Sequence, residues 1–507
     1  MDRRLALQTL AALAATPAAA RASPASRVAR FDAAAARQPW LLPLKGVTDA
    51  GGALDASRLD LRGRWPDELR GRFYRNGPAL FERGGARYHH WFDGDGMVQQ
   101  FTLAGGAGAP VISHRGRLVA TSKLRREQRA GRFLMSAFGT GIAPPADVPA
   151  QGPDSFNTAN TNALEHAGRV LAMWEGGSAH ALDPADLSTQ GPVTWGEGLE
   201  QLPFSAHPKV DRRGHLWNIG AAGKHLVVWH IDPQGQLVSA RRTDLPLPQA
   251  MVHDMAVTEQ HVVVPIAPLT LHLAELARGA TLEQAIRYHR EQPLRVLVMR
   301  KDDPTQHRVF ELPPQMVVHV GNAFERNNGE IELSYVGASD AGFLTAGATA
   351  MMVGDRVVGG RSSTQRAVLD LRSGRARLEA FDDQVEFPRM DPRRVGLPAR
   401  WLVQTAVWRH DRPNGMFHGL QLCDLQRGGQ RRYDYGDRMV VEEHVVVPKP
   451  GREGELDAWL LGTTFDTVRK VTVLNVLDAA HVEDGPFAQA TLPYALPYGF
   501  HGNFTAA

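Results

Sequence analysis

Four histidines, each inside a short and distinctive run of sequence, are the residues of this chain best suited to chemistry. Imidazole is the commonest metal-binding side chain in proteins, and four neutral imidazoles suit a borderline divalent ion such as iron, zinc or copper. We therefore expect a metal site whose ligands come from distant parts of the chain. The four candidates are His207 in FSAHPKVD, His253 in MVHDMAV, His319 in VVHVGNAFE and His501 in PYGFHGNF.

The intervals between these histidines restrict the fold that can hold them. They are 46, 66 and 182 residues long, so no single helix or hairpin can gather the four side chains. A β-propeller can, because its innermost strands surround one axis that an inward side chain from each can reach. The two shorter intervals are near one blade each, and the long interval leaves room for the remaining blades.

A repeated pattern of strand, aspartate and turn supports this architecture. Five aspartates mark comparable points, separated by 49, 138, 54 and 54 residues. A degenerate period near fifty residues is typical of propeller blades, and the long gap would hold two or three more units. The same pattern also occurs in β-sandwiches, so the repeat favours a propeller without requiring it. The five residues are Asp183, Asp232, Asp370, Asp424 and Asp478.

Helical patterns are few, and the best of them covers residues 269–292. Gly279 divides it into two pieces, and Thr281 starts the second. Two interpretations of its apolar stretch 269–276 stay open: packing against the propeller face, or contact with a membrane or with the entry path of an apolar substrate. A loop over residues 139–162, rich in Pro, Gly and Asn, is expected to cover the top of the site.

The composition is that of an ordinary globular protein and argues against several functions. The chain of 507 residues is 43% hydrophobic and 22% charged, with a formal net charge of only +3. Arginines gather at 125–132, but aromatic residues do not alternate with them as on a nucleic-acid stacking platform. We therefore expect a solvated helix face there and no nucleic-acid partner. Cys423 is the only cysteine, which excludes an intramolecular disulfide and thiolate metal sites.

The N-terminus has the order of a secretory signal. Arg3 and Arg4 precede a modestly apolar stretch and then the small residues of an A-x-A cleavage site. The paired arginines resemble a twin-arginine signal, whereas the alternative is an Ala-rich amphipathic helix. We expect residues 1–22 to be this signal, residues 23–40 a linker and residues 41–507 a single propeller domain. The protein would then be periplasmic or otherwise exported.

Ordered motifs along nearly the whole mature chain carry a family resemblance. They run from GRFYRNGPAL at Gly71 to PYGFHGNF and include HHWFDGDGMV, NTANTNAL, AMWEGG, FSAHPKVD, HDMAVTE and HVGNAFE. With these motifs the chain resembles the carotenoid cleavage oxygenases, the family of apocarotenoid and lignostilbene dioxygenases and the retinoid isomerohydrolase. It looks closest to the bacterial apocarotenoid branch. The resemblance implies an all-β, seven-bladed propeller with a few helices and loops capping its top face.

The resemblance also implies an Fe(2+) centre on the propeller axis, with the four histidines as its ligands. Glutamates would orient three of these imidazoles from behind. Thr161 falls where the family has a small side chain near the position of dioxygen, and its methyl group could restrict the open coordination site. The three glutamates are Glu175 in AMWEGG, Glu386 in VEFPRM and Glu443 in VEEHVVVP, where Glu442 is left open as the alternative to Glu443.

The implied reaction is oxidative scission of a conjugated C=C bond by O2, giving two carbonyl products. The preferred substrate is an apocarotenoid-like polyene, whose long dry cavity Phe133 and its apolar neighbours could line. Stilbenoid-cleaving relatives instead hold a phenolic hydroxyl with a tyrosine and a lysine, for which Tyr88 and Lys123 are the candidates. A non-catalytic propeller that binds an apolar ligand and an isomerase are the alternatives of other kinds.

Overall fold

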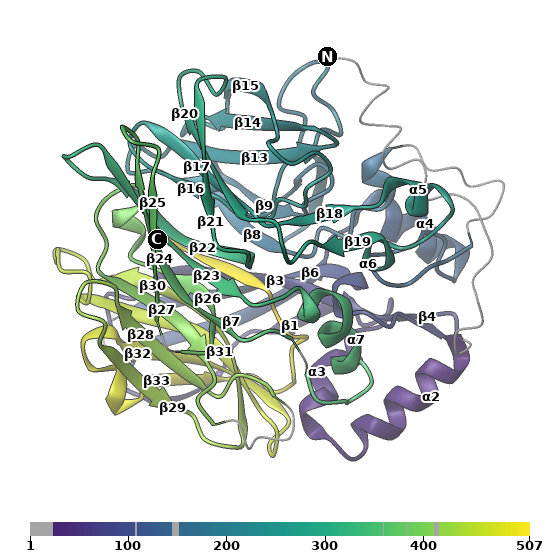
Figure 1. Cartoon of the computed structure of the whole chain (residues 1–507). Helices are drawn as coiled ribbons and strands as arrows, with labels where there is room; N and C mark the ends of the chain where they lie inside the picture. The colour runs from purple at the N-terminus through teal and green to yellow at the C-terminus, as the bar shows by residue number, and fades with distance from the viewer. Residues whose placement is uncertain (1–23, 107–108, 144–151, 358, 382, 410–414) are drawn as a thin grey trace.

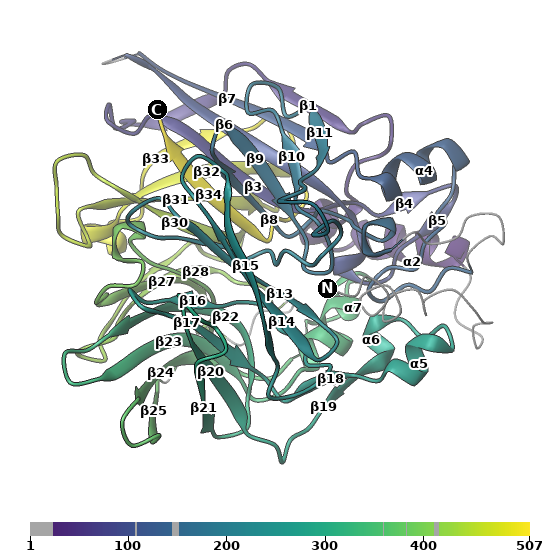
Figure 2. The same ribbon diagram turned by 90° about the horizontal axis from the view of Figure 1, so that it is seen from above.

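The computed structural model of the chain describes residues 24–106, 109–143, 152–357, 359–381, 383–409 and 415–507. Apart from two short hairpins, the described strands form seven antiparallel sheets of four or five strands, arranged as the blades of a propeller (Figures 1 and 2). This confirms the all-β fold and the seven blades that the sequence and its resemblance indicate. The expected signal, residues 1–22, lies outside the described residues.

Blades 2 to 6 are each built from four strands in chain order, and the first strand of each lies innermost. Blade 2 holds β8 (Asn162–His166), β9 (Arg169–Met173), β10 (His180–Leu182) and β11 (Thr189–Pro192). Blade 3 holds β12 (Lys209–Val210), β13 (Leu216–Ala222), β14 (His225–Ile231) and β15 (Leu237–Asp244). Blade 4 holds β16 (Ala256–Val257), β17 (His261–Ile266), β20 (Leu294–Arg300) and β21 (His307–Leu312). Blade 5 holds β22 (Met316–Glu325), β23 (Glu330–Ala338), β24 (Ser362–Asp370) and β25 (Ala376–Ala380). Blade 6 holds β26 (Val385–Arg389), β27 (Trp401–Ala406), β28 (Gly419–Asp424) and β29 (Gln430–Asp434).

Blades 1 and 7 close the ring by combining strands that are far apart in sequence. Strand β34 pairs with β3, placing His501 opposite Asn76, and β2 pairs with β33. The inner strand β34 contacts β8 of blade 2 and β30 of blade 7. Blade 1 holds β1 (Ala53–Ala56), β7 (Ala109–Leu118), β6 (Asp95–Gly106), β3 (Gly71–Leu80) and β34 (His501–Ala506). Blade 7 holds β2 (Asp60–Gly63), β33 (Pro486–Thr491), β32 (Val471–Asp478), β31 (Ala458–Asp466) and β30 (Met439–Pro448).

The repeated aspartates occupy one equivalent position in five blades, the turn from the third strand to the fourth. There each carboxylate accepts a backbone N–H from two residues further on, as Asp232 does from Gln234 at 2.9 Å and Asp424 from Gln426 at 3.1 Å. This local bond stabilises a tight turn, which is why the pattern recurs with the blade. Blade 4, whose third strand ends at Arg300, is the one blade in the long gap of the repeat, so the expectation of two or three units there is wrong. The gap is long because the insertion that holds β18 (Leu269–Leu271) and β19 (Ile286–Tyr288) and the segment that holds η5 (Phe343–Gly347) and α7 (Ala348–Met351) also lie in it.

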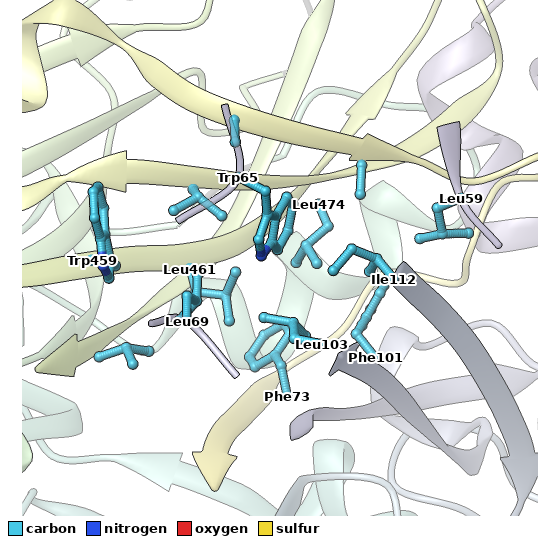
Figure 3. Close-up of a cluster of buried hydrophobic side chains, with 14 of the residues drawn as sticks. Leu59, Trp65, Leu69, Phe73, Phe101, Leu103, Ile112, Trp459, Leu461 and Leu474 are labelled. Atoms are coloured by element: carbon cyan, nitrogen blue, oxygen red, sulfur yellow. The ribbon is translucent and has the colours of Figure 1, made fainter. Parts of the chain in front are cut away.

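A buried apolar cluster fills the interface between the two closing blades (Figure 3). Phe73 and Phe101 reach it from blade 1, Leu461 and Leu474 from blade 7, and Trp65 from the segment between β2 and β3. Removing apolar surface from water stabilises contact by about 25 cal/mol per Å². The seam where the ring closes is therefore held by hydrophobic packing as well as by strand pairing.

Helices and long connections gather on one side of the ring, the right side in Figures 1 and 2. No helix among the described residues is long and apolar enough to cross a bilayer. The helices on this side of the ring are α4 (Ser122–Ala130), α5 (Leu273–Ala277), α6 (Leu282–Ala285), the π-helix η5 (Phe343–Gly347) and α7 (Ala348–Met351). The two short hairpins are β4 (Glu82–Arg83)–β5 (Ala86–Arg87) and β18 (Leu269–Leu271)–β19 (Ile286–Tyr288). Short 3-10 turns are η3 (Trp91–Asp93), η4 (Pro153–Ser155), η6 (Pro392–Arg394) and η7 (Ala479–Asp484).

The expectation of a linker over residues 23–40 is wrong for the part that the structure describes. Helix α2 (Pro24–Ala35) is followed by η2 (Pro39–Leu41) and α3 (Leu42–Lys45). Phe31 is fully buried, and the guanidinium of Arg87 lies 3.5 Å from the centre of its ring. The Gln38 side chain donates to the carbonyl of Gly354 at 2.7 Å. The segment therefore packs on the propeller instead of hanging from it.

The helical pattern over residues 269–292 is only partly helical. Helices α5 and α6 lie on either side of Gly279, and Thr281 caps α6 as the sequence predicts, its side chain accepting from the backbone of Gln284. The two ends form the β18–β19 hairpin instead, with Leu269 opposite Tyr288. Pairing between the ends of the insertion thus outweighs the helical preference of its sequence.

Candidate metal centre and cavity

The four histidines expected as ligands come together inside the ring of inner strands. Each offers one ring nitrogen, and these four atoms lie within 4.8 Å of one another. The ring centre of His207 lies 4.4 Å from that of His253 and 4.5 Å from that of His501. His319 and His501 have ring centres 4.6 Å apart. The spacing allows all four nitrogens to face one central point.

Each histidine is positioned by a different blade. His207 and His253 lie just before β12 and β16, the innermost strands of blades 3 and 4, and His501 begins β34. His319 lies within β22, where the register with β23 shifts on both sides of Val320. A bulge of this kind turns a side chain away from the normal alternation of a strand. The local irregularity therefore aims His319 at the centre.

Three glutamates hold the imidazoles from behind, as the resemblance implies. Glu175 Oε1 lies 2.5 Å from His253 Nδ1, and Glu386 Oε2 lies 2.6 Å from His319 Nδ1. Glu443 Oε1 lies 2.9 Å from His501 Nδ1. A carboxylate can only accept, so each of these Nδ1 atoms carries the proton and each Nε2 keeps its lone pair for a metal.

Adjacent glutamates on β30 have separate partners, and this settles which of them braces a ligand. Glu443 contacts His501 and also accepts from the backbone of Gly502 at 2.8 Å. Glu442 instead forms a buried ion pair with Arg75 and accepts from the backbone of Gly499 at 2.6 Å. A register shift between Val441 and His444 lets both neighbouring carboxylates be buried. Glu443 is therefore the residue at the metal centre.

The environment of two of the four ligands favours neutral imidazole. Burial, together with the neighbouring imidazoles, holds the pKa of His207 well below its ordinary value. Burial also lowers the pKa of His501 to about 4, against the opposing effect of Glu443. For His253, burial lowers the pKa but the contact with Glu175 outweighs it, so the pKa is raised. Protons therefore compete with a metal more strongly at His253 than at His207 or His501.

The arrangement of nitrogens fits a bound cation. His207 Nε2 is buried and has no hydrogen-bond partner among the described residues. His253 Nε2 and His319 Nε2 lie 3.3 Å apart, and both keep lone pairs because their Nδ1 protons go to glutamates. Two facing lone pairs repel each other unless a positive ion lies between them. The donor set of four imidazoles suits a borderline divalent metal.

A cavity of about 460 Å³ opens onto this centre. His253, His319 and His501 line it, whereas His207 is buried behind them. The ligand set is thus closed on one side and exposed to the cavity on the other.

The 269–276 stretch also lines the cavity, so its leucines face the binding space rather than only packing against the propeller. The volume and apolar walls are those of a small-molecule site.

Aromatic rings next to the motif residues form much of the cavity wall. Trp174 precedes Glu175, Phe387 follows Glu386, and Phe500 precedes His501. Sequence reasoning did not select these rings, although their position beside the motif residues was a usable signal. Phe387 adopts a φ of 56°, a conformation rare for a bulky residue. Its ring lies 5.3 Å from that of His319, so the strained backbone places an apolar wall against a ligand.

Thr161, expected near the dioxygen position, lines the same cavity just before β8. Its backbone N–H donates to the carbonyl of Met173 at 3.0 Å, which fixes it to blade 2. The segment just before Thr161 lies close to the backbone of Gly96. Only glycine fits there, since a Cβ at Gly96 would lie 2.2 Å from the carbonyl oxygen of Ala159. Thr161 therefore lines the same cavity as three of the four histidines.

A family model and known relatives match nearly the whole described chain. The model for the retinal pigment epithelial membrane protein family, which includes the carotenoid cleavage oxygenases, matches residues 51–506. The chain belongs to this family. As a carotenoid cleavage oxygenase it is 29% identical to the apocarotenoid-15,15'-oxygenase of Synechocystis sp. over 483 residues, which cover 92% of this chain and 96% of the relative. It is also 29% identical to lignostilbene-α,β-dioxygenase isozyme III of Sphingomonas paucimobilis over 488 residues, with the same shares covered.

Solved structures of the Synechocystis apocarotenoid oxygenase share the fold of this family member. A cobalt-substituted form superposes with a TM-score of 0.80 at 26% identity, covering 92% of this chain and 98% of that one. A chimera of that oxygenase superposes with a TM-score of 0.82 at the same identity and coverage. The four-histidine cluster is the candidate metal site of this carotenoid cleavage oxygenase.

The substrate contacts expected from Tyr88, Lys123 and Phe133 are not where the sequence placed them. Tyr88 and Lys123 do come together, with Lys123 Nζ donating to the Tyr88 hydroxyl at 3.0 Å. Phe133 stacks on Tyr88 with ring centres 3.9 Å apart. None of the three lines the cavity, and all are buried. The expectation was wrong because Lys123 is occupied by Asp95 at 2.8 Å and Glu127 at 3.0 Å.

Changing Lys123 to Met should destabilise the fold without altering substrate preference. The change leaves Asp95 and Glu127 buried with only Arg83 to balance them, and losing one partner of a buried ion pair costs about 3–5 kcal/mol. Because Arg83 remains, we expect the free energy of unfolding to fall by about 3 kcal/mol, the lower end of this range. The measurement is the midpoint of urea unfolding. A selective loss of activity on hydroxystilbenes, with stability unchanged, would restore the phenol-binding role.

Proposed function

We propose that this chain uses iron(II) to cleave a conjugated C=C bond of an apocarotenoid-like polyene. Its family membership makes it an alkene-cleaving dioxygenase, and the apocarotenoid oxygenase of Synechocystis sp. is among its relatives. The observation that carries the proposal is the four-histidine centre, three of whose ligands face an apolar cavity. Four neutral nitrogen ligands leave a divalent ion its full charge, which favours the ferrous state.

The residues of the site have distinct tasks in this reaction. When bound, iron would supply the redox chemistry by which dioxygen reacts with an alkene. The glutamates hold the Nδ1 protons of three ligands and thereby aim Nε2 at the centre. Phe387 and Phe500 exclude water and offer flat surfaces against which a conjugated chain can lie. Thr161 narrows the exposed side, so the alkene and dioxygen are confined next to each other.

The overall change balances without a further reductant. The C=C bond breaks and the O–O bond breaks, and each alkene carbon gains one oxygen atom to become a carbonyl group. One alkene and one O2 thus give two carbonyl products. The site needs no nicotinamide or flavin to close this balance.

A second substrate class is supported by the relatives. The lignostilbene dioxygenase matches this chain at the same identity as the apocarotenoid oxygenase. Against it, Tyr88 and Lys123 are buried away from the cavity and Lys123 is already neutralised by two carboxylates. We therefore place stilbenoid cleavage second and retain it as an outcome of the test.

The test pairs two substrates in air with protein reconstituted with Fe(II). We expect an apocarotenal to give two shorter carbonyl compounds by mass spectrometry, with one atom from labelled O2 in each before exchange. A hydroxystilbene should give little or no aldehyde. Cleavage of the stilbene alone would replace the polyene by the second class. Absence of cleavage of both, in protein that holds iron, would support a non-catalytic propeller.

Export and membrane contact belong to the same proposal. Residues 1–22, outside the described part, have the order of a twin-arginine signal, which carries folded proteins and would allow iron to be loaded before transport. A peripheral contact with a membrane would deliver an apolar polyene to the leucine-rich wall formed by residues 269–276. Cell fractionation of the full chain, compared with a form in which Arg3 and Arg4 are lysines, tests the route.

A further inference from the structure

The part of the cavity over blades 5 to 7 is lined mainly by apolar side chains. Val407, Phe417 and Val441 all line it. Gln384 stands among them and lines the same space. Gln384 is only half-buried, so without a substrate its carboxamide is open to the cavity.

The position of Gln384 relative to the metal follows from strand geometry. Glu386, two residues further along, lines the cavity and holds His319 Nδ1 at 2.6 Å. Val385 between them is fully buried on the opposite face, in a cluster with Val336 and Ala406. Two residues of a strand span about 7 Å and share one face. Gln384 lies immediately before β26, and its carbonyl accepts from the backbone of Val407 at 2.8 Å, so it continues the strand pairing. It therefore lines the cavity two residues before the glutamate that holds His319.

Within the described part of the chain, the carboxamide of Gln384 makes no hydrogen bond, while polar side chains around it are already used. Ser362, which also lines the cavity, donates from Oγ to the carbonyl of Val385 at 2.6 Å. Asp383, on the other face, accepts from Thr364 and from Gln421, each at 2.8 Å. Gln384 is therefore available to a bound molecule in a way that its neighbours are not.

A carboxamide can both donate and accept, which matches a hydroxyl or a carbonyl group. A substrate ending in hydrocarbon would cover the amide and leave it without a partner, which is costly. A substrate with oxygen at that point would replace the lost water. We propose that Gln384 binds the oxygen-bearing end group of the substrate and makes this chain selective for polyenes that carry a terminal hydroxyl or carbonyl. This rests on the proposed polyene cleavage and adds the end group to it.

A second glutamine provides a matched control. Gln249 also lines the cavity, but it lies between β15 and β16, on the side of blades 3 and 4. Its backbone N–H donates to Gly223 at 3.0 Å and its carbonyl accepts from Leu271 at 3.1 Å, so its place does not depend on its side chain. Replacing either glutamine by Leu removes one carboxamide from the same cavity wall.

The experiment measures binding without turnover. Metal-loaded protein is kept free of oxygen and titrated with an apocarotenol and with the same polyene ending in a methyl group. Quenching of tryptophan fluorescence reports binding, since Trp91 and Trp174 line the cavity. We expect wild type to prefer the alcohol, and Gln384→Leu to weaken alcohol binding about 10-fold to 100-fold while leaving the hydrocarbon within about twofold. Gln249→Leu should change neither by more than about twofold.

Each other outcome overturns the proposal. These are equal affinity of wild type for the two ligands, equal losses for both ligands in Gln384→Leu, or a selective loss in Gln249→Leu alone. Gln384→Asn, which keeps a shorter carboxamide, should bind the alcohol with intermediate affinity. This variant still tests the proposal if Gln384→Leu does not fold. Because binding is measured without oxygen, failure of wild type to cleave either ligand in air would count against the proposed reaction and not against this selectivity.

Discussion

Replacing His253 by Ala is expected to abolish stoichiometric metal binding and all oxygenase activity. One of four converging nitrogens is lost, and Glu175 is left without its imidazole partner. Loss of an outer hydrogen-bond partner alone costs about 10–100-fold in metal affinity, so loss of a ligand should exceed that range. The measurement is iron content after anaerobic reconstitution and desalting, which should fall from about one ion per chain to a trace.

His261 supplies the control for this change. It lies in β17 of blade 4 and its Nδ1 is 2.9 Å from Glu325 Oε1, so it forms a histidine–glutamate pair remote from the centre. His261→Ala should keep full iron content. Equal iron in both variants, or equal loss in both, would contradict the assignment of His253 as a ligand.

Glu443→Gln and Glu442→Gln should separate metal affinity from stability at two adjacent positions. In the first variant, the carboxamide keeps only one acceptor oxygen, so its NH2 group would face either His501 Nδ1 or the backbone N–H of Gly502, where a Glu443 oxygen now accepts. We expect iron affinity to fall about 10–100-fold, measured by competition with a chelator, in protein that remains folded.

Glu442→Gln should instead lower the stability of the fold. Arg75 is buried beside Glu442, and its guanidinium would lose its counter-charge. Breaking such a pair costs about 3–5 kcal/mol, which should lower the midpoint of urea unfolding while iron affinity of the folded fraction stays within about threefold. If Glu442→Gln weakened iron binding as much as Glu443→Gln, the two roles assigned here would be wrong.

Motif context was sufficient to select the metal site from the sequence. The chain has twenty histidines, yet the four that the family resemblance assigns as ligands are the ones that converge, and Glu175 and Glu386 were found in the same way. The aspartates also favoured a propeller, because each stabilises a turn at the same point of a blade. Such features depend on local hydrogen bonds that a sequence pattern records directly.

What the sequence did not reveal depends on contacts between distant segments. Alternation along a strand cannot assign Glu442 and Glu443 when a bulge lets both be buried. The partners Asp95 and Glu127 that sequester Lys123 come together only in the fold. Helix α2 was taken for a linker because its one large apolar anchor, Phe31, finds a partner in Arg87 more than fifty positions away.

His501 gives the metal a mechanical role besides its chemical one, because the strand that carries it also completes blade 1 by pairing with β3. An ion held jointly by this strand and by blades 3, 4 and 5 would tie the last strand of the chain to the blades on the other side of the axis. By mass action, free metal at a hundred times its dissociation constant adds about 2.7 kcal/mol to the closed form. A cell short of the metal would therefore hold a more fragile protein, and not merely an idle one.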